Sequence, residues 1–112
     1  MTDIRKNEVY FAEVTFVDSN ESKKRPVVVL SNNQYNREAP DVIVCGITTN
    51  ASHNCYCPIG SPDLSYGNLF SDSGVRVDML SRINKNKLQV KIGKITDEYH
   101  KKILVKIVEL IG

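Results

Sequence analysis

Arg25 and Thr48 are two of the side chains in this sequence with the chemistry to hold a phosphate group. The guanidinium of Arg25 is a rigid fork of N–H donors that stays charged at any working pH, so it could neutralise phosphate oxygens. The hydroxyl of Thr48 could donate a hydrogen bond to another oxygen of that group. Taken alone, Arg25 is better explained as a surface residue and Thr48 as a β-branched strand residue. Their significance therefore depends on the elements that position them.

Those elements are strands. Residues 9–17 alternate, with Tyr10, Ala12, Val14 and Phe16 on one face and Glu13 and Thr15 on the other. A wholly polar connection, residues 18–24, leads to residues 25–31, whose aliphatic run suits a strand buried on both faces. A third strand covers residues 42–48. Arg25 would then begin the second strand, and Thr48 would end the third.

The rest of the chain predicts more strands and one helix. We expect a polar connector at 32–40, strands at 55–59, 75–83 and 88–95, and turns at 60–67 and 84–86. Tyr99, Ile103, Ile107 and Ile111 recur every four residues, which predicts an amphipathic helix capped by Thr96. Such a helix must dock on the sheet to be stable. The expected fold is mainly β, a curled antiparallel sheet closed by a C-terminal helix, in one domain over residues 1–112.

The composition is that of an ordinary globular protein. Of 112 residues, 41% are hydrophobic and 25% charged, which argues against disorder. A net charge of +2 permits RNA as a partner, whereas proteins that grip long duplex DNA usually carry a larger excess. No apolar stretch has the length of a membrane helix, and residues 1–8 lack the apolar core of a signal peptide. We therefore expect a cytoplasmic protein whose three cysteines are reduced.

Several blocks, taken in order, resemble the MazF/PemK family of toxins. They are residues 24–32 (KRPVVVLSN), 41–49 (DVIVCGITT), 72–73 (DS), 81–88 (SRINKNKL) and 92–96 (IGKIT). No single block is decisive, but the ordered set spans nearly the whole chain, from residue 9 to residue 112. The resemblance implies a small SH3-like antiparallel barrel with a C-terminal helix, shared with the CcdB toxins.

The resemblance also implies an activity and partners. It implies the toxin of a type II toxin–antitoxin system, a homodimer that cuts single-stranded RNA in a sequence-specific way and stops translation. Its cognate antitoxin would fill the RNA groove with a flexible tail. Cleavage without metal uses the 2′-OH as nucleophile. It needs a base for the 2′-OH proton, a cation for the phosphorane and a proton for the departing 5′-oxygen.

The family's catalytic residues map onto two positions of this chain. Arg25 takes the place of the conserved arginine that stabilises the transition state, and Thr48 that of the catalytic threonine. Thr49 competes with Thr48, because a one-residue slip turns its side chain to the other face. Glu21 is the candidate base, although a solvated carboxylate is a weak base at neutral pH. His53 titrates near neutrality, but a lone loop histidine is usually just exposed.

RNA contacts are predicted from the polar connections and, for Ser73 and Asp78, from positions where the resemblance implies contact with RNA. The predicted RNA-binding residues are Ser19, Asn20, Lys24, Thr49, His53, Ser73 and Asp78. Tyr56 and Tyr66 could stack on unpaired bases, although half-buried packing explains both somewhat better.

Two departures from the family pattern stand out. The family usually opens its first strand with Gly-Asp, where this chain has Asn7-Glu8; Glu8 could keep the charge, but Asn7 lacks the free backbone of glycine. Cys55 and Cys57 share a strand face, but a zinc site needs about four ligands, so reduced thiols explain them better. We expect no metal and no cofactor.

Two other functions stay open. A CcdB-like module would poison a topoisomerase without chemistry, through exposed apolar residues at the end of the helix. The pairing of Arg25 with Thr48 argues for the nuclease instead. A catalytically inactive barrel would bind nucleic acid and leave it intact.

Overall fold

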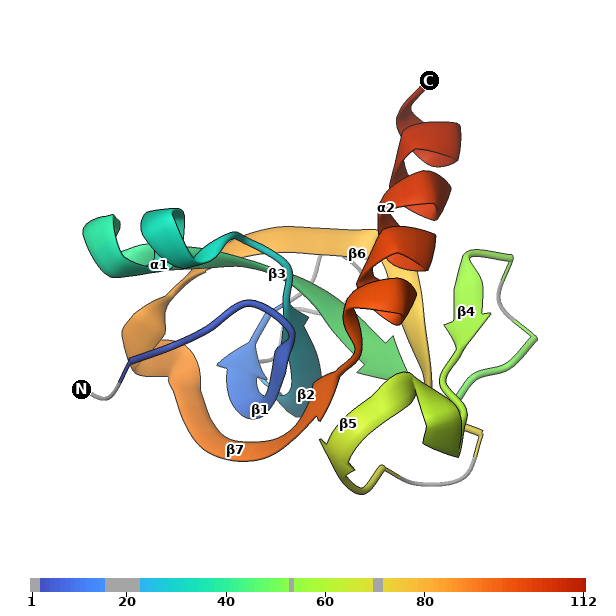
Figure 1. Cartoon of the computed structure of the whole chain (residues 1–112), viewed down its shortest axis with the longest axis horizontal. Coiled ribbons are helices and arrows are strands. Elements are labelled where there is room, and N and C mark those ends of the chain that lie inside the picture. Colours follow the sequence, from blue (N-terminus) through green and yellow to red (C-terminus); the bar gives the residue numbers. More distant parts are fainter. Residues whose placement is uncertain (1–2, 16–22, 53, 70–71) are drawn as a thin grey trace.

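A strongly curled antiparallel sheet dominates the computed structural model, which describes residues 3–15, 23–52, 54–69 and 72–112 (Figure 1). Within this part of the chain the strand order is β4-β6-β3-β2-β1-β7-β5. The strands are β1 Glu8–Val14, β2 Lys23–Val29, β3 Asp41–Thr48, β4 Tyr56–Pro58, β5 Leu64–Gly67, β6 Gly74–Asn84 and β7 Leu88–Ile95. The helices are α1 Asn33–Glu38 and α2 Asp97–Ile111, with single 3₁₀ turns at Ser61–Asp63 and Lys85–Lys87. The expected curled sheet with a C-terminal helix is confirmed.

The aliphatic run of β2 lies in the middle of this sheet. Val27, Val28 and Val29 are all fully buried, as expected for a strand covered on both faces. Val28 packs in the cluster beneath α2, together with Ile47, Tyr99 and Ile103. Val27 and Val29 pack in a second cluster on the opposite face. The two cores hold the sheet between them and fix the position of its strand ends.

Two segments differ from the sequence-based expectation. The polar connector at 32–40 contains helix α1, because Asn32 caps it by accepting from the Tyr35 N–H at 2.8 Å. Asn36 is buried there and donates from Nδ2 to the Ser31 carbonyl at 2.9 Å, so these asparagines stabilise a helix rather than a turn. The turn expected at 60–67 contains strand β5, which pairs with the end of β7.

The register of β2 and β3 positions the two residues of chemical interest. Val27 pairs with Gly46 and Val28 with Cys45. Because strand side chains alternate, the same register continued by two residues places Arg25 opposite Thr48 on one face. Residues 23 positions apart in the chain are thereby brought together where β2 begins and β3 ends.

Helix α2 docks on the sheet along one face, from Tyr99 to Ile107. Thr96 is the N-cap, as predicted, and accepts from the Tyr99 N–H at 3.1 Å. Tyr99 and Ile103 are buried, and the Tyr99 hydroxyl donates to the Cys57 carbonyl at 2.6 Å. Ile107, one turn beyond Ile103, is partly buried against the same core, and the last turn of the helix points away from the sheet (Figure 1). Among the described residues, no helix has both the length and the apolar character needed to cross a membrane.

Candidate functional site

A cavity of about 580 Å³ opens where β2 begins and β3 ends. Its polar rim is formed by Lys24, Arg25, Thr48, Thr49, Asn68 and Ser73. Its apolar wall is formed by Phe11, Pro26, Ile47, Leu69 and Ile92. The rim carries two cationic side chains and, among the described lining residues, no carboxylate. The cavity is therefore suited to an anionic ligand.

Arg25 is available for such a ligand. Its side chain is half-buried at the start of β2, and neighbouring Lys24 is exposed. Within the described part of the chain, the Arg25 guanidinium makes no hydrogen bond or ion pair, so its donors are unused. Partial burial strengthens the attraction between a guanidinium and an anion, because less water screens it. This is the geometry expected of a phosphate-binding arginine.

The Thr48 hydroxyl accepts one hydrogen bond within the protein and can still donate one. Its Oγ1 accepts from the Asn50 N–H at 3.1 Å, which fixes the loop after β3. Because the hydroxyl oxygen accepts this bond, its own hydrogen remains for donation to a ligand oxygen. Thr49 is exposed and lines the same cavity, so it remains a competitor of Thr48 for the role of the catalytic threonine.

The structure gathers some predicted RNA-binding residues and not others. Lys24, Thr49 and Ser73 line the cavity, although Ser73 is only 3% exposed. Asp78 does not; its carboxylate accepts from Arg76 Nε at 2.8 Å and from Nη2 at 3.0 Å. Ser19, Asn20, Glu21 and His53 lie outside the described residues. The role of Glu21 as general base therefore stays a prediction.

The two tyrosines have different surroundings. Tyr56 packs against Gly74, where an added Cβ would come within 2.5 Å of the ring, and its hydroxyl donates to the Asp72 carbonyl. This supports packing rather than base stacking for Tyr56. Tyr66 is 47% exposed and lines a second cavity of about 390 Å³. That cavity shares Asn68 and Leu69 with the first.

Sequence reasoning missed several lining residues. Phe11 had a usable signal, because it is an aromatic residue on the strand face that also carries Glu13 and Thr15. Ile92 is a half-buried strand residue, and nothing in its type distinguishes it from other core positions. Asn68 and Leu69 lie in an irregular loop that only the folded chain brings to the cavity.

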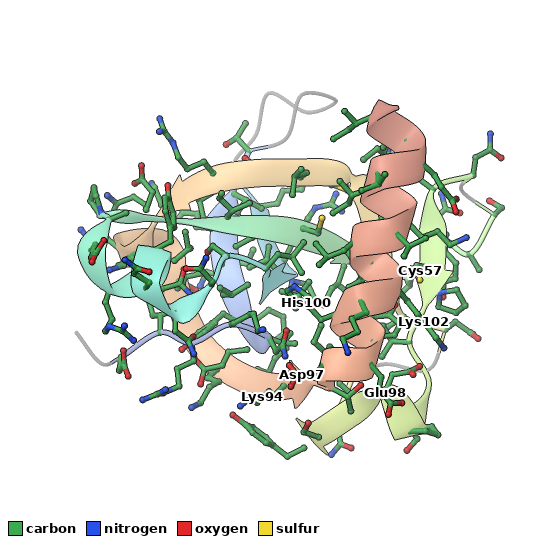
Figure 2. The ribbon with its side chains drawn as sticks, turned by 45° about the horizontal axis from the view of Figure 1, so that its top comes forward. Cys57, Lys94, Asp97, Glu98, His100 and Lys102 are labelled. Carbon is green, nitrogen blue, oxygen red and sulfur yellow. The ribbon has the colours of Figure 1, made fainter. Side chains whose placement is uncertain are left out.

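The departure at Asn7 has a structural explanation. Asn7 adopts a left-handed backbone with φ 78°, which glycine adopts freely and asparagine tolerates better than most residues. Asn7 Nδ2 donates to Asp97 Oδ1 at 2.7 Å. The other atom of the same amide, Asn7 Oδ1, accepts from His100 Nδ1 at 2.6 Å. In Figure 2, Asp97 and His100 lie at the base of α2, near the sheet. Asn7 thus supplies the turn and also ties α2 to it.

Glu8 and His100 are both buried and structural. Burial alone would raise the pKa of the Glu8 carboxyl, but hydrogen bonds from the Arg5 N–H, Lys91 and Tyr10 together hold it below its ordinary value. Burial, reinforced by the charge of Lys6, lowers the pKa of His100, so its imidazole is neutral. Neither lines the cavity beside Arg25.

Cys45, Cys55 and Cys57 form no disulfide bond. Burial raises the pKa of Cys45 to about 12, so it is inert as a nucleophile. In the described ranges no group of three or more His, Cys, Asp or Glu residues could hold a metal ion.

Comparisons with known proteins add an independent line of evidence. Residues 5–111 match the family described as PemK-like, MazF-like toxin of type II toxin–antitoxin system. The chain is 28% identical over 101 residues to endoribonuclease MazF of Staphylococcus saprophyticus, covering 89% of this chain and 84% of that protein. It is 29% identical over 101 residues to endoribonuclease EndoA of Bacillus subtilis, covering 89% and 87%.

The fold has the same relatives. The structure of MazE–MazF from Deinococcus radiodurans superposes with a TM-score of 0.78 at 16% identity, covering 100% of this chain and 98% of that one. At this identity the likeness concerns the fold alone.

Proposed function

This chain belongs to the family of PemK-like, MazF-like toxins of type II toxin–antitoxin systems, and from that premise we propose that it is a metal-independent, sequence-specific endoribonuclease. Its substrate is single-stranded RNA, and cleavage of mRNA inhibits translation. The observation that carries the proposal is the cavity where Arg25, which has no partner among the described residues, and the Thr48 hydroxyl lie on neighbouring strand ends. The two curated relatives are both named endoribonucleases.

The proposed chemistry is an internal displacement at phosphorus. The 2′-oxygen attacks the adjacent phosphorus, the bond from phosphorus to the 5′-oxygen breaks, and a 2′,3′-cyclic phosphate and a 5′-hydroxyl result. Arg25 neutralises the charge that builds up on the phosphorane oxygens, and Thr48 donates to one of them. Lys24 adds to the positive field at the rim. Glu21 accepts the 2′-OH proton.

The proposal includes partners. A cognate antitoxin binds the toxin, as in the MazE–MazF structure from Deinococcus radiodurans. The chain forms a homodimer, supported by the exposed apolar end of α2, where Val105, Val108 and Ile111 are 57%, 66% and 74% exposed. The protein works in the cytoplasm, where its RNA substrate is found.

The topoisomerase-poison alternative gains one observation from the same helix end. Exposed apolar residues there are what such a module would need. A poison would not need an arginine beside a threonine hydroxyl at the rim of a cavity, so the cavity favours the nuclease. A catalytically inactive barrel would keep the cavity and bind RNA without cutting it.

The deciding experiment is cleavage of a long single-stranded RNA by purified, antitoxin-free protein in EDTA. We expect fragments with 2′,3′-cyclic phosphate ends, and the mapped ends give the recognised sequence. Arg25→Ala should lower the rate by about a hundred- to a thousandfold, on the order of 3 kcal/mol or more. Thr48→Val should act in the same direction, while Thr48→Ser, which keeps the hydroxyl, should retain most activity.

Two results would overturn the proposal. Intact RNA after incubation with folded wild-type protein on several sequences would exclude the nuclease, and a gel shift in that experiment would identify the inactive binding barrel. Equal cleavage by wild type and Arg25→Ala would point to a contaminating ribonuclease.

A further inference from the structure

The cavity beside Arg25 has an apolar wall that phosphate binding does not explain. Five of its described lining residues are apolar, and they lie next to the cations Lys24 and Arg25. Phe11 in this wall keeps 36% of its surface exposed. A contiguous apolar wall next to cationic side chains in one cavity is typical of a ligand-binding site.

Phe11 belongs to an apolar row that crosses four neighbouring strands. Val90 on β7 pairs with Phe11 on β1, and Phe11 pairs with Pro26 on β2. The β2–β3 register continued by one residue places Ile47 beside Pro26. Exposure falls along this row from 59% at Val90 to 36% at Phe11 and 3% at Ile47. The row therefore descends from solvent into the cavity, with Phe11 at its mouth.

A nucleotide has the same two-part chemistry as this cavity, an anionic phosphate attached to a flat base. We infer that Phe11 stacks on the base of a nucleotide adjoining the phosphate that Arg25 holds, with Pro26 supporting the ring from the next strand. Aromatic side chains stack on unpaired bases regardless of base identity, since every base has a π-face. The inference rests on the proposed ribonuclease function and deepens it.

The contact accounts for a preference for single strands. A base inside a duplex is stacked on both faces and cannot offer one to Phe11 without being extruded, which costs free energy. Phe11 touches the substrate but carries no group for proton transfer. It is therefore a positioning residue, whose loss should raise KM more than it lowers kcat.

The test combines protein variants with RNA that lacks one base. Phe11→Leu keeps an apolar side chain but loses the ring, whereas Phe11→Tyr keeps the ring. Val90→Ala is the matched control, because Val90 is exposed on the same row but does not line the cavity. Each protein is titrated with an oligonucleotide that spans the mapped cleavage site, with 2′-deoxyribose there to prevent cutting. The series places an abasic residue at each position in turn.

We expect Phe11→Leu to weaken binding of the intact oligonucleotide by about five- to a hundredfold, and Phe11→Tyr to restore it. One abasic position beside the scissile phosphate should weaken wild-type binding by a similar factor. That same abasic oligonucleotide should bind Phe11→Leu as tightly as the intact one does, because the partner of the missing base is already gone. Val90→Ala should bind like wild type, and all variants should unfold at wild-type temperature.

The failures of the two proposals are distinguishable. The stacking contact is wrong, and the ribonuclease stands, if wild type binds and cuts RNA and Phe11→Leu binds it equally well. The same conclusion follows if the loss of affinity from Phe11→Leu and the loss from the abasic residue multiply at every position. An equal loss in Val90→Ala would also refute a specific contact. If wild type neither binds nor cuts RNA, both proposals fall together.

Discussion

At the scale of single residues, two arginines differ in their hydrogen bonding. Arg76 donates two hydrogen bonds to the Asp78 carboxylate, so an RNA group that binds Asp78 must compete with them. Arg25 has no such partner among the described residues. A guanidinium left unpaired next to a cavity is ready for an anion, because no existing bond must break when a phosphate arrives.

Asn7 allows a prediction about stability. Its φ of 78° is strained for a residue with a Cβ, and its side chain bonds both Asp97 and His100. Asn7→Ala should lower the free energy of unfolding by about 2–4 kcal/mol, since it keeps the strain and loses both hydrogen bonds. Asn7→Gly should lose less, because glycine adopts this φ freely. Urea unfolding measures both, and equal losses would mean that the backbone conformation contributes nothing.

At the scale of elements, α2 is fixed to the sheet by a buried histidine whose charge state matters. Desolvation and the charge of Lys6 lower the pKa of His100, with Asp97 opposing them. The unfolded chain therefore takes up a proton before the folded protein does. The contribution of His100 to stability is full above about pH 6.5 and is lost as the pH falls from there toward the lowered value.

We therefore expect the unfolding free energy to fall between pH 7 and pH 5, and to fall less in His100→Asn. The asparagine amide lies at the position of Nδ1 and can still donate to Asn7 Oδ1, but it does not titrate in this range. Glu8 contributes little here, because a lowered carboxyl pKa makes its stabilising effect fall mainly at pH values below its ordinary pKa of 4.5. Urea titrations of both proteins at several pH values give the comparison. Parallel curves would show that His100 is not the group responsible.

How much the sequence could predict differs between elements. The strand of Val27 to Val29 and the helix capped by Thr96 follow from patterns confined to their own residues, and both are confirmed. Helix α1 was wrongly predicted as a connector, because Asn32 and Asn36 favour turns unless a cap and a buried partner are available. Those partners come from the folded chain, and so does the irregular loop that carries Asn68 and Leu69 to the cavity.

At the scale of the whole molecule, the curl of the sheet assembles the site. Phe11, Arg25, Thr48, Ser73 and Ile92 come from five separate parts of the chain and line one cavity. The positions of Arg25 and Thr48 could be predicted from the sequence, because the family's catalytic arginine and threonine map onto them. The apolar wall could not, because it depends on how far the strands bend toward one another. The sequence therefore predicted which polar residues line the cavity better than it predicted the apolar wall beside them.

The exposed end of α2 leads to the last prediction. Val108 and Ile111 are 66% and 74% exposed, so they present apolar surface to solvent. In a symmetric dimer the same patch on each copy would be buried against its partner, which favours association without any charge pairing. Val108→Lys combined with Ile111→Lys should therefore give a monomer at concentrations where wild type is a dimer. Exposed positions tolerate lysine, so the far-ultraviolet circular dichroism should not change.

Analytical ultracentrifugation across a hundredfold range of protein concentration distinguishes the outcomes. A matched control is Lys102→Ala, which removes a charge from an exposed position on the same helix and leaves the apolar patch intact. A wild-type protein that sediments as a monomer throughout, or a double variant that remains dimeric, would exclude this helix end as the self-association surface. In the first case the patch would be free for another protein, the arrangement on which the topoisomerase-poison alternative depends.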